Sequence, residues 1–337
     1  MSQLKDGGFF VQKFDEKFGT YSLDAEYPRK ETQIEKPHYS LTETQYFGFF
    51  VPEERIQCFM WTWYHPNMNV VSGGVMGWQG FKKFNVGCEI LDYRAFMNGE
   101  LVEDFTNYTL DSGITLAMTK PGQQFRLTYD DPEHGNSFDV IQDAVSEPLM
   151  WPSNHHFEQI MRCSGTITMR GKTHEVKCFS VRDRSYGEYR KELSIAIPPN
   201  NWMAATFDEN NAFCVVGLDD PKREPLWKGR FDIAPDALLR FGWMVIDGER
   251  VVITRVSMKT DFDSELLPRR ITLRVTDSNG REHDLVGEAY ASLPFAPWPN
   301  ARMPICAMRW TWNGRVGLGE FQSLQYNDFA RLHGSYT

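Results

Sequence analysis

The chain has 337 residues, and its 45 acidic against 36 basic side chains give a formal net charge of −9. Such an acidic chain has no overall attraction for nucleic acid or an anionic membrane surface, and no apolar stretch approaches the ~20 residues of a membrane span. Aromatic residues make up 14% of the sequence, which favours β-sheet and supplies flat walls for an apolar ligand.

The sequence also predicts the cellular location of the protein and its cofactor requirement. The N-terminal residues lack the apolar core of a signal peptide, and the six cysteines show neither CxxC nor the Cys/His spacing of a zinc site. We therefore expect a cytoplasmic protein with free thiols. GxGxxG, GxSxG, HExxH and the lysine loop of nucleotide-binding proteins are also missing, so we expect no metal, nicotinamide or flavin cofactor.

After an irregular lead-in rich in Lys, Glu and Pro, β-like runs alternate with turn signals. Type I′ turns need positive φ at both central residues, which Asn and Gly tolerate. Five dipeptides are predicted as such turns: Asn98-Gly99, Arg170-Gly171, Asp247-Gly248, Asn279-Gly280 and Asn313-Gly314. Residues 139–145 are predicted as one short helix and 328–333 as a terminal turn. Strands without intervening helices predict two sequential antiparallel barrels or half-barrels, cut near residues 188–200.

The most informative stretch runs from residue 154 to residue 190. If Arg170-Gly171 is a two-residue turn, opposed residues sum to 341, so Glu158 faces Asp183 and Cys163 faces Cys178. The side chains then divide between two faces of the hairpin. One face carries His156, Glu158, Asp183 and Ser185; the other carries His155, Phe157, Gln159, Arg182, Arg184 and Tyr186.

Two directly opposed carboxyls cannot both ionise cheaply when they are desolvated, so either Asp183 or Glu158 is expected to keep a proton that it can donate. The neighbouring imidazole of His156 can reset that proton after turnover. The structural alternative is an ion-pair network of Arg182, Asp183, Arg184 and Glu188 that only holds domains together. Cys163 and Cys178 are interpreted as small buried apolar residues.

An aromatic run at residues 59–65 precedes a second aromatic segment that ends at Trp78. On a strand, Phe59, Trp61 and Trp63 lie on one face. They are interpreted either as core packing or, with Trp78, as the wall of a site for an apolar substrate, where their π faces could stabilise a developing carbocation.

Several segments together resemble one known superfamily. These are His156-x-Glu158-Gln159, Ser164-Gly165-Thr166, Arg182-Asp183-Arg184-Ser185-Tyr186-Gly187, Gly242-Trp243-Met244-Val245-Ile246-Asp247-Gly248-Glu249 and Gly314-Arg315-Val316-Gly317-Leu318-Gly319-Glu320. The pattern resembles the tandem calycin-like (lipocalin-like) superfamily of hydroxyneurosporene synthase (a carotenoid hydratase), kievitone hydratase and related Diels–Alderases and cyclases. The resemblance implies two tandem lipocalin-like β barrels with few short helices, at 1–190 and 191–337.

In the hydratase branch, proton chemistry is credited to the aspartate of the Asp-His-Ser/Asn-Trp-Gly signature and to a histidine on the partner strand. By position these are Asp183 and His156. This chain has Arg184 and Tyr186 where the signature has His and Trp, Val181 where carotenoid enzymes carry Tyr, and Glu158 where they carry an aromatic residue, which argues against carotenoid itself as substrate.

The sequence therefore predicts a cofactor-independent hydratase, isomerase or cyclase that acts on a lipophilic terpenoid-, steroid- or polyketide-like molecule. Asp183, His156 and Glu158 are the predicted catalytic residues. The predicted binding residues are His155, Arg182, Arg184, Tyr186, Trp61, Trp63 and Trp78. Two alternatives stay open: a non-catalytic lipophile-binding protein, and a Diels–Alderase-like pericyclase that uses hydrogen bonds from Tyr186 or Arg184. A homodimer is compatible with the sequence.

Overall fold

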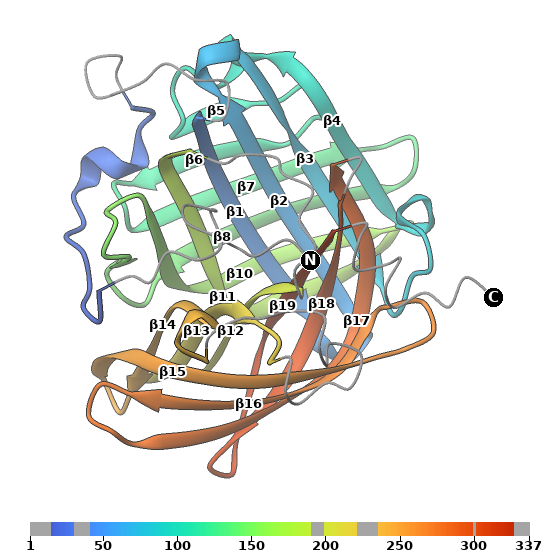
Figure 1. The fold of residues 1–337 in the computed structure, drawn as a ribbon. Helices are drawn as coiled ribbons and strands as arrows, with labels where there is room; N and C mark the ends of the chain where they lie inside the picture. Colours follow the sequence, from blue (N-terminus) through green and yellow to red (C-terminus); the bar gives the residue numbers. More distant parts are fainter. Residues whose placement is uncertain (1–14, 30–40, 190–198, 221–234, 299–300, 327–337) are drawn as a thin grey trace. The chain divides into compact units, whose positions relative to one another are not determined.

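The computed structural model describes residues 15–29, 41–189, 199–220, 235–298 and 301–326, and Figure 1 labels most of their strands. The chain forms two compact units. An open-sheet unit comprises residues 18–79 and 86–191, and a barrel unit comprises residues 1–17, 80–85 and 192–337. Helical structure in the described ranges is limited to 3-10 turns such as Leu23–Glu26 (η1) and Gly99–Val102 (η6). None of these helices has the length and apolar character needed to cross a bilayer.

The open-sheet unit is a single antiparallel sheet of eleven strands. Its strands are β1 (Leu41–Val51), β2 (Ile56–His65), β3 (Val70–Gln79), β4 (Ile90–Asn98), β5 (Asn107–Thr109), β6 (Thr115–Lys120), β7 (Gln124–Asp131), β8 (Asn136–Ala144), β9 (Leu149–Met150), β10 (His156–Met169) and β11 (Lys172–Tyr189). The order is β4-β3-β2-β1-β11-β10-β8-β7-β6-β5, with β9 beside β10. The first and last strands thus pair in the middle of the sheet, and β1 is buried along its whole length.

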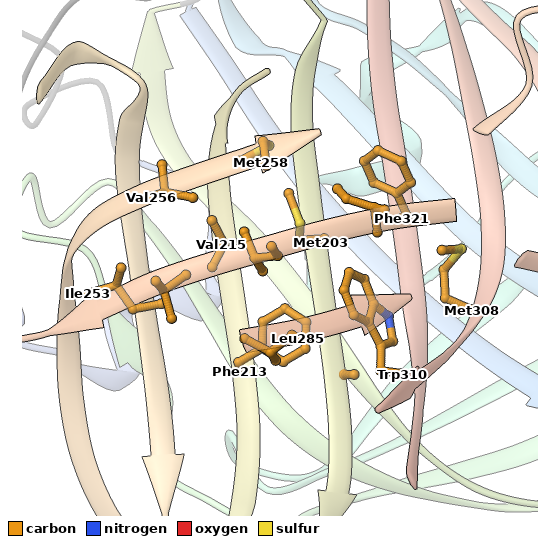
Figure 2. Close-up of a cluster of buried hydrophobic side chains, with 14 of the residues drawn as sticks. Met203, Phe213, Val215, Ile253, Val256, Met258, Leu285, Met308, Trp310 and Phe321 are labelled. Carbon is orange, nitrogen blue, oxygen red and sulfur yellow. The ribbon is translucent and has the colours of Figure 1, made fainter. Parts of the chain in front are cut away.

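The barrel unit is a closed eight-stranded barrel. Its strands are β12 (Asn200–Asp208), β13 (Asn211–Leu218), β14 (Leu239–Ile246), β15 (Glu249–Phe262), β16 (Pro268–Asp277), β17 (Glu282–Trp298), β18 (Ala301–Trp312) and β19 (Arg315–Tyr326). Side chains from the strands fill the barrel core, with Met203, Phe213, Met308, Trp310 and Phe321 packed together (Figure 2). These findings confirm the predicted all-β class, and they show that the barrel unit has a packed core.

Three of the five predicted turns have the predicted form. Arg170-Gly171, Asp247-Gly248 and Asn313-Gly314 each join two paired strands with positive φ at both residues. The prediction for Asn98-Gly99 is wrong, because Asn98 has extended backbone and its side chain accepts a hydrogen bond from the Glu100 amide to cap η6. Asn279-Gly280 also ends a hairpin, but within a four-residue connection from Asp277 to Glu282.

The predicted helix at 139–145 is also wrong, because these residues belong to β8. Buried side chains there alternate at Phe138, Val140 and Gln142, the period of a strand, and β8 pairs on both sides with β7 and β10. The predicted turn at 328–333 lies outside the described residues.

The connection between β16 and β17 is organised by one buried carboxylate. Asp277 Oδ1 accepts from the backbone amides of Asn279 and Arg281 (both 2.9 Å), and Oδ2 contacts Arg281 Nε at 2.6 Å and His283 Nε2 at 3.0 Å. Burial alone would raise the pKa of the Asp277 carboxyl, but the hydrogen bonds from His283 and Arg281 outweigh it and hold the pKa below its usual value.

We expect Asp277→Asn to lower the free energy of unfolding by about 1–3 kcal/mol at pH 7, because it removes charged hydrogen bonds from a buried site. A depressed folded-state pKa contributes stability above the unfolded pKa, and this contribution is lost as the pH falls through the folded pKa. Urea unfolding at pH 7 and near pH 3 should therefore show a smaller difference between wild type and variant at low pH. An equal difference at both values would contradict the assignment.

Candidate active site

The pairing of β10 with β11 is the frame of the candidate site. Its register places Glu158 opposite Asp183, His156 opposite Ser185 and Cys163 opposite Cys178, which confirms the predicted sum of 341 without a bulge. Side chains of directly opposed residues share one face of a sheet. The hairpin therefore presents the two predicted sets of residues to its two opposite faces.

One face carries a buried chain of hydrogen bonds. Ser185 Oγ lies 2.8 Å from His156 Nδ1, and His156 Nε2 lies 3.2 Å from Glu158 Oε1. Trp151 donates its indole N–H to both Glu158 oxygens at 2.9 and 3.0 Å, and its ring meets the His156 ring edge-on with centroids 4.7 Å apart. Glu158, Ser185, His156 and Trp151 are all buried, so this network is shielded from solvent.

These contacts are consistent with one tautomer of a neutral His156. Nε2–H donates to Glu158, which acts only as an acceptor, and Nδ1 accepts the hydroxyl hydrogen of Ser185. In this state Nδ1 carries the lone pair, so His156 can act as a base on the side of Ser185. Trp151 and Glu158 fix the ring from the opposite side.

Asp183 lies beside this chain in a row of side chains that crosses the sheet. It pairs with Tyr46 on β1, and Tyr46 pairs in turn with Trp61 on β2, so all three point to the same face. Tyr46 contacts the Trp61 ring edge-on at 6.0 Å between centroids. We call this the aromatic face and define it by Tyr46, Phe59, Trp61, Trp63, Trp78, His156, Glu158, Asp183 and Ser185.

The predicted aromatic wall therefore lies on the same face as the predicted catalytic residues. Trp61 and Trp63 are in contact at 5.1 Å between ring centroids, and Phe59 meets Trp78 edge-on at 6.0 Å. Asp183 is partly exposed, unlike its neighbour Glu158. The aromatic face thus combines a carboxyl, an imidazole and a run of π surfaces.

The hydrogen bond from the Trp151 indole to Glu158 can be tested by what it contributes to the free energy of unfolding. Trp151→Phe keeps an aromatic ring beside His156 but removes one hydrogen bond from a buried carboxylate. Trp78→Phe is the matched control, because Trp78 is buried and its Nε1 has no hydrogen-bond acceptor among the described residues. We expect Trp151→Phe to lower the free energy of unfolding by about 1–3 kcal/mol more than Trp78→Phe does. Equal losses in urea titrations would show that Glu158 does not depend on this donor.

The opposite face, which we call the arginine face, holds Arg182 and Arg184. Arg182 makes a bidentate contact with Glu26, with Nη1–Oε2 at 3.0 Å and Nη2–Oε1 at 2.5 Å, and its Nε donates to Gln159 at 2.8 Å. Its guanidinium also lies 4.3 Å from the ring centroid of Phe125. Both charged groups of the Arg182–Glu26 pair are fully buried.

Arg184 is paired in a similar way with Glu43 on β1, with 2.6 Å between Nη2 and Oε2. Burial raises the pKa of the Glu43 carboxyl, and the neighbouring Arg184 opposes that rise. The backbone amide of Arg29 donates to Glu43 Oε1 at 3.2 Å. Hence the arginines on either side of Asp183 in sequence find carboxylate partners on the other face of the sheet.

Of the other two predicted binding residues on this side, Tyr186 lines a pocket and His155 contacts a residue of its lining. Tyr186 lines it together with Arg29, whose guanidinium lies 4.5 Å from the Tyr186 ring centroid. Arg29 Nη2 is 2.5 Å from His155 Nδ1. Since the sheet separates this pocket from Asp183, Tyr186 and His155 are placed apart from the predicted catalytic residues.

Sequence reasoning missed Trp151, Tyr46, Glu43 and Arg29 as members of these sites. Trp151 could have been found, because only a short turn separates it from His156 and its backbone amide bonds to the His156 carbonyl at 2.8 Å. Glu43 and Arg29 carry no such local signal. The pairing of β1 with β11 brings Glu43 to Arg184, and Arg29 reaches His155 across more than a hundred residues of sequence. Within the described ranges, no three His, Cys, Asp or Glu side chains are grouped as metal ligands.

Several solved structures share the fold of this chain. Kievitone hydratase from Nectria haematococca shares the fold at 12% identity, with a TM-score of 0.52 over 94% of this chain and 98% of that one. CghA gives 9% identity and a TM-score of 0.55 over 95% and 96% of the two chains. A protein assigned as AttH from Nitrosomonas europaea is 12% identical, with a TM-score of 0.50 over 85% of this chain and 92% of that one. The chain belongs to the DUF7064 family, described as a domain of unknown function, whose model matches residues 29–328. No curated protein matches it.

Proposed function

We propose that this protein is a cofactor-independent hydratase, isomerase or cyclase that performs acid/base chemistry on a C=C bond of a lipophilic isoprenoid-, steroid- or polyketide-like molecule. The observation that carries the proposal is the row across the aromatic face. Asp183 stands between the hydrogen-bonded His156–Glu158 pair on one side and Tyr46 with Trp61 on the other. An acid, a base and π surfaces on one sheet face are the groups that alkene protonation requires.

In a hydration, Asp183 transfers its proton to one alkene carbon, and the rings of Trp61 and Trp63 stabilise the cation that forms. Water adds to the cation and gives up its excess proton to His156 Nδ1 through the Ser185 hydroxyl. Glu158 stabilises the imidazolium, because it already accepts the Nε2–H hydrogen bond. Return of this proton to Asp183 restores the starting state. In an isomerisation or cyclisation, the cation loses a carbon-bound proton instead.

The predicted binding residues of the arginine face fit a second candidate function, which is lipophile binding without catalysis. The pocket lined by Tyr186 favours this candidate. Arg184 lies beside it, with its guanidinium 5.7 Å from the Tyr186 ring centroid and its Nη2 donating to the Tyr27 carbonyl at 3.1 Å. Kievitone hydratase is named for a hydration, and one structure of CghA contains Sch210972, so both candidates involve a small molecule.

Incubation in D₂O separates the two candidates. The purified protein is given a panel of polyprenoid, steroid and polyketide alkenes, and each mixture is analysed by mass spectrometry. An enzyme of the proposed kind places deuterium on carbon in at least one compound, and a hydratase also adds the elements of water. A compound that binds and is recovered without deuterium or rearrangement would support the binding protein instead.

A further inference from the structure

A large pocket lies on the arginine side of the open-sheet unit and is not used by the proposed reaction. Its volume is about 980 Å³, which is enough for a drug-sized ligand. Tyr186 of β11, Tyr64 of β2 and Tyr27 after η1 bring three phenol rings to its lining. Segments far apart in sequence therefore build one aromatic-lined cavity within a single unit.

The charged groups of the lining are mostly negative. Asp24, Glu100 and Glu103 are solvent-exposed carboxylates, and Arg29 is the single basic residue among the described lining residues. The Arg29 guanidinium is engaged at the wall, where it stacks on Tyr186 and contacts His155. The charged groups that face a ligand are therefore chiefly carboxylates, and an anionic ligand would meet three negative charges.

Tyr64, a residue of the lining, lies near two carboxylates. Burial, together with the carboxylates of Glu43 and Glu103, raises the pKa of the Tyr64 phenol. Like any tyrosine with an ordinary or raised pKa, Tyr64 has a neutral, electron-rich ring at physiological pH. Tyrosine faces next to carboxylates attract a cation both through the ring quadrupole and through charge.

We infer that this pocket is a binding site for an aromatic or polycyclic ligand that carries a protonated amine. The ammonium group lies among Asp24, Glu100 and Glu103, and the apolar body stacks on Tyr27, Tyr64 and Tyr186. The site is separate from Asp183, which lies on the other face of the sheet. It therefore does not depend on the proposed reaction.

Three matched probes test this inference: 2-naphthylmethylammonium, 2-naphthylmethanol and 2-naphthoate, titrated calorimetrically at pH 7. We expect the ammonium probe to bind about ten-fold more tightly than the neutral alcohol, and the carboxylate to bind most weakly. The preference for the ammonium probe should weaken at high salt, because the carboxylates are exposed. Equal binding of the three probes, or tightest binding of naphthoate, would overturn the inference.

The same titrations on variants of the pocket carboxylates test whether the ammonium probe binds in this pocket. Glu100→Gln combined with Glu103→Gln should remove most of the preference for the ammonium probe. Glu175→Gln is the matched control, because Glu175 is an exposed acid of β11 that does not line the pocket. Asp183→Asn should leave ammonium binding unchanged, which distinguishes this site from the aromatic face. If the double variant, still folded by its melting temperature, keeps the full preference, the amine site is not in this pocket.

Discussion

Asp183→Asn is expected to reduce turnover by about 10²–10⁴-fold while the protein stays folded and nearly as stable as wild type. The amide keeps the size of the side chain but cannot deliver a proton at neutral pH. Binding of the lipophile should change little, because Trp61, Trp63 and Trp78 are untouched. The measurement is product formation per folded molecule, with the alkene found in the deuterium screen, together with the melting temperature of the same sample.

The structure sharpens this experiment, because Arg182 and Arg184 lie on the opposite face and are paired with Glu26 and Glu43. Replacement of the Asp183 carboxyl therefore does not strip these two arginines of their carboxylate partners. Asp130→Asn, at an exposed position on β7, is the control for the substitution itself. A stable Asp183→Asn protein with wild-type turnover would remove the catalytic assignment and favour the binding protein.

Glu26→Gln is expected to lower the free energy of unfolding by about 3–5 kcal/mol, because it leaves the buried Arg182 charge without its counterion. Glu26 lies on η1, far from β11 in sequence, and Tyr21 also donates to its Oε1 at 2.8 Å. Urea titration should show a lower midpoint with an unchanged slope. Replacing both partners, Glu26→Leu with Arg182→Met, should recover part of the loss, since no unpaired charge then remains buried.

The chain provides a matched control for this pair. Arg126 and Asp139 make a similar bidentate contact, with Nε–Oδ1 at 2.8 Å and Nη2–Oδ2 at 2.5 Å, but both side chains are about half exposed. Asp139→Asn should therefore cost far less than Glu26→Gln, because solvent screens an exposed pair. Similar losses for both variants would show that burial is not what makes the Arg182–Glu26 contact important.

Local signals in the sequence were enough to predict the all-β class and the central hairpin. The Arg170-Gly171 turn fixes the register of β10 and β11, because each step back along one strand matches a step forward along the other. This brought Glu158 opposite Asp183 and separated the two sets of side chains correctly. The same local reasoning failed for Asn98-Gly99, where capping of η6 competes with the hairpin turn.

Only the tertiary structure decided what lies next to each face of that hairpin. The pairing of β11 with β1, more than a hundred residues earlier in the chain, brings Tyr46 to Asp183 and Glu43 to Arg184. No periodicity within either strand encodes this pairing, since it depends on which edges meet when the sheet assembles. The sequence therefore determined the hairpin and the chemistry it carries. Long-range tertiary contacts decided that the aromatic wall shares the face of Asp183, and which carboxylates pair with Arg182 and Arg184.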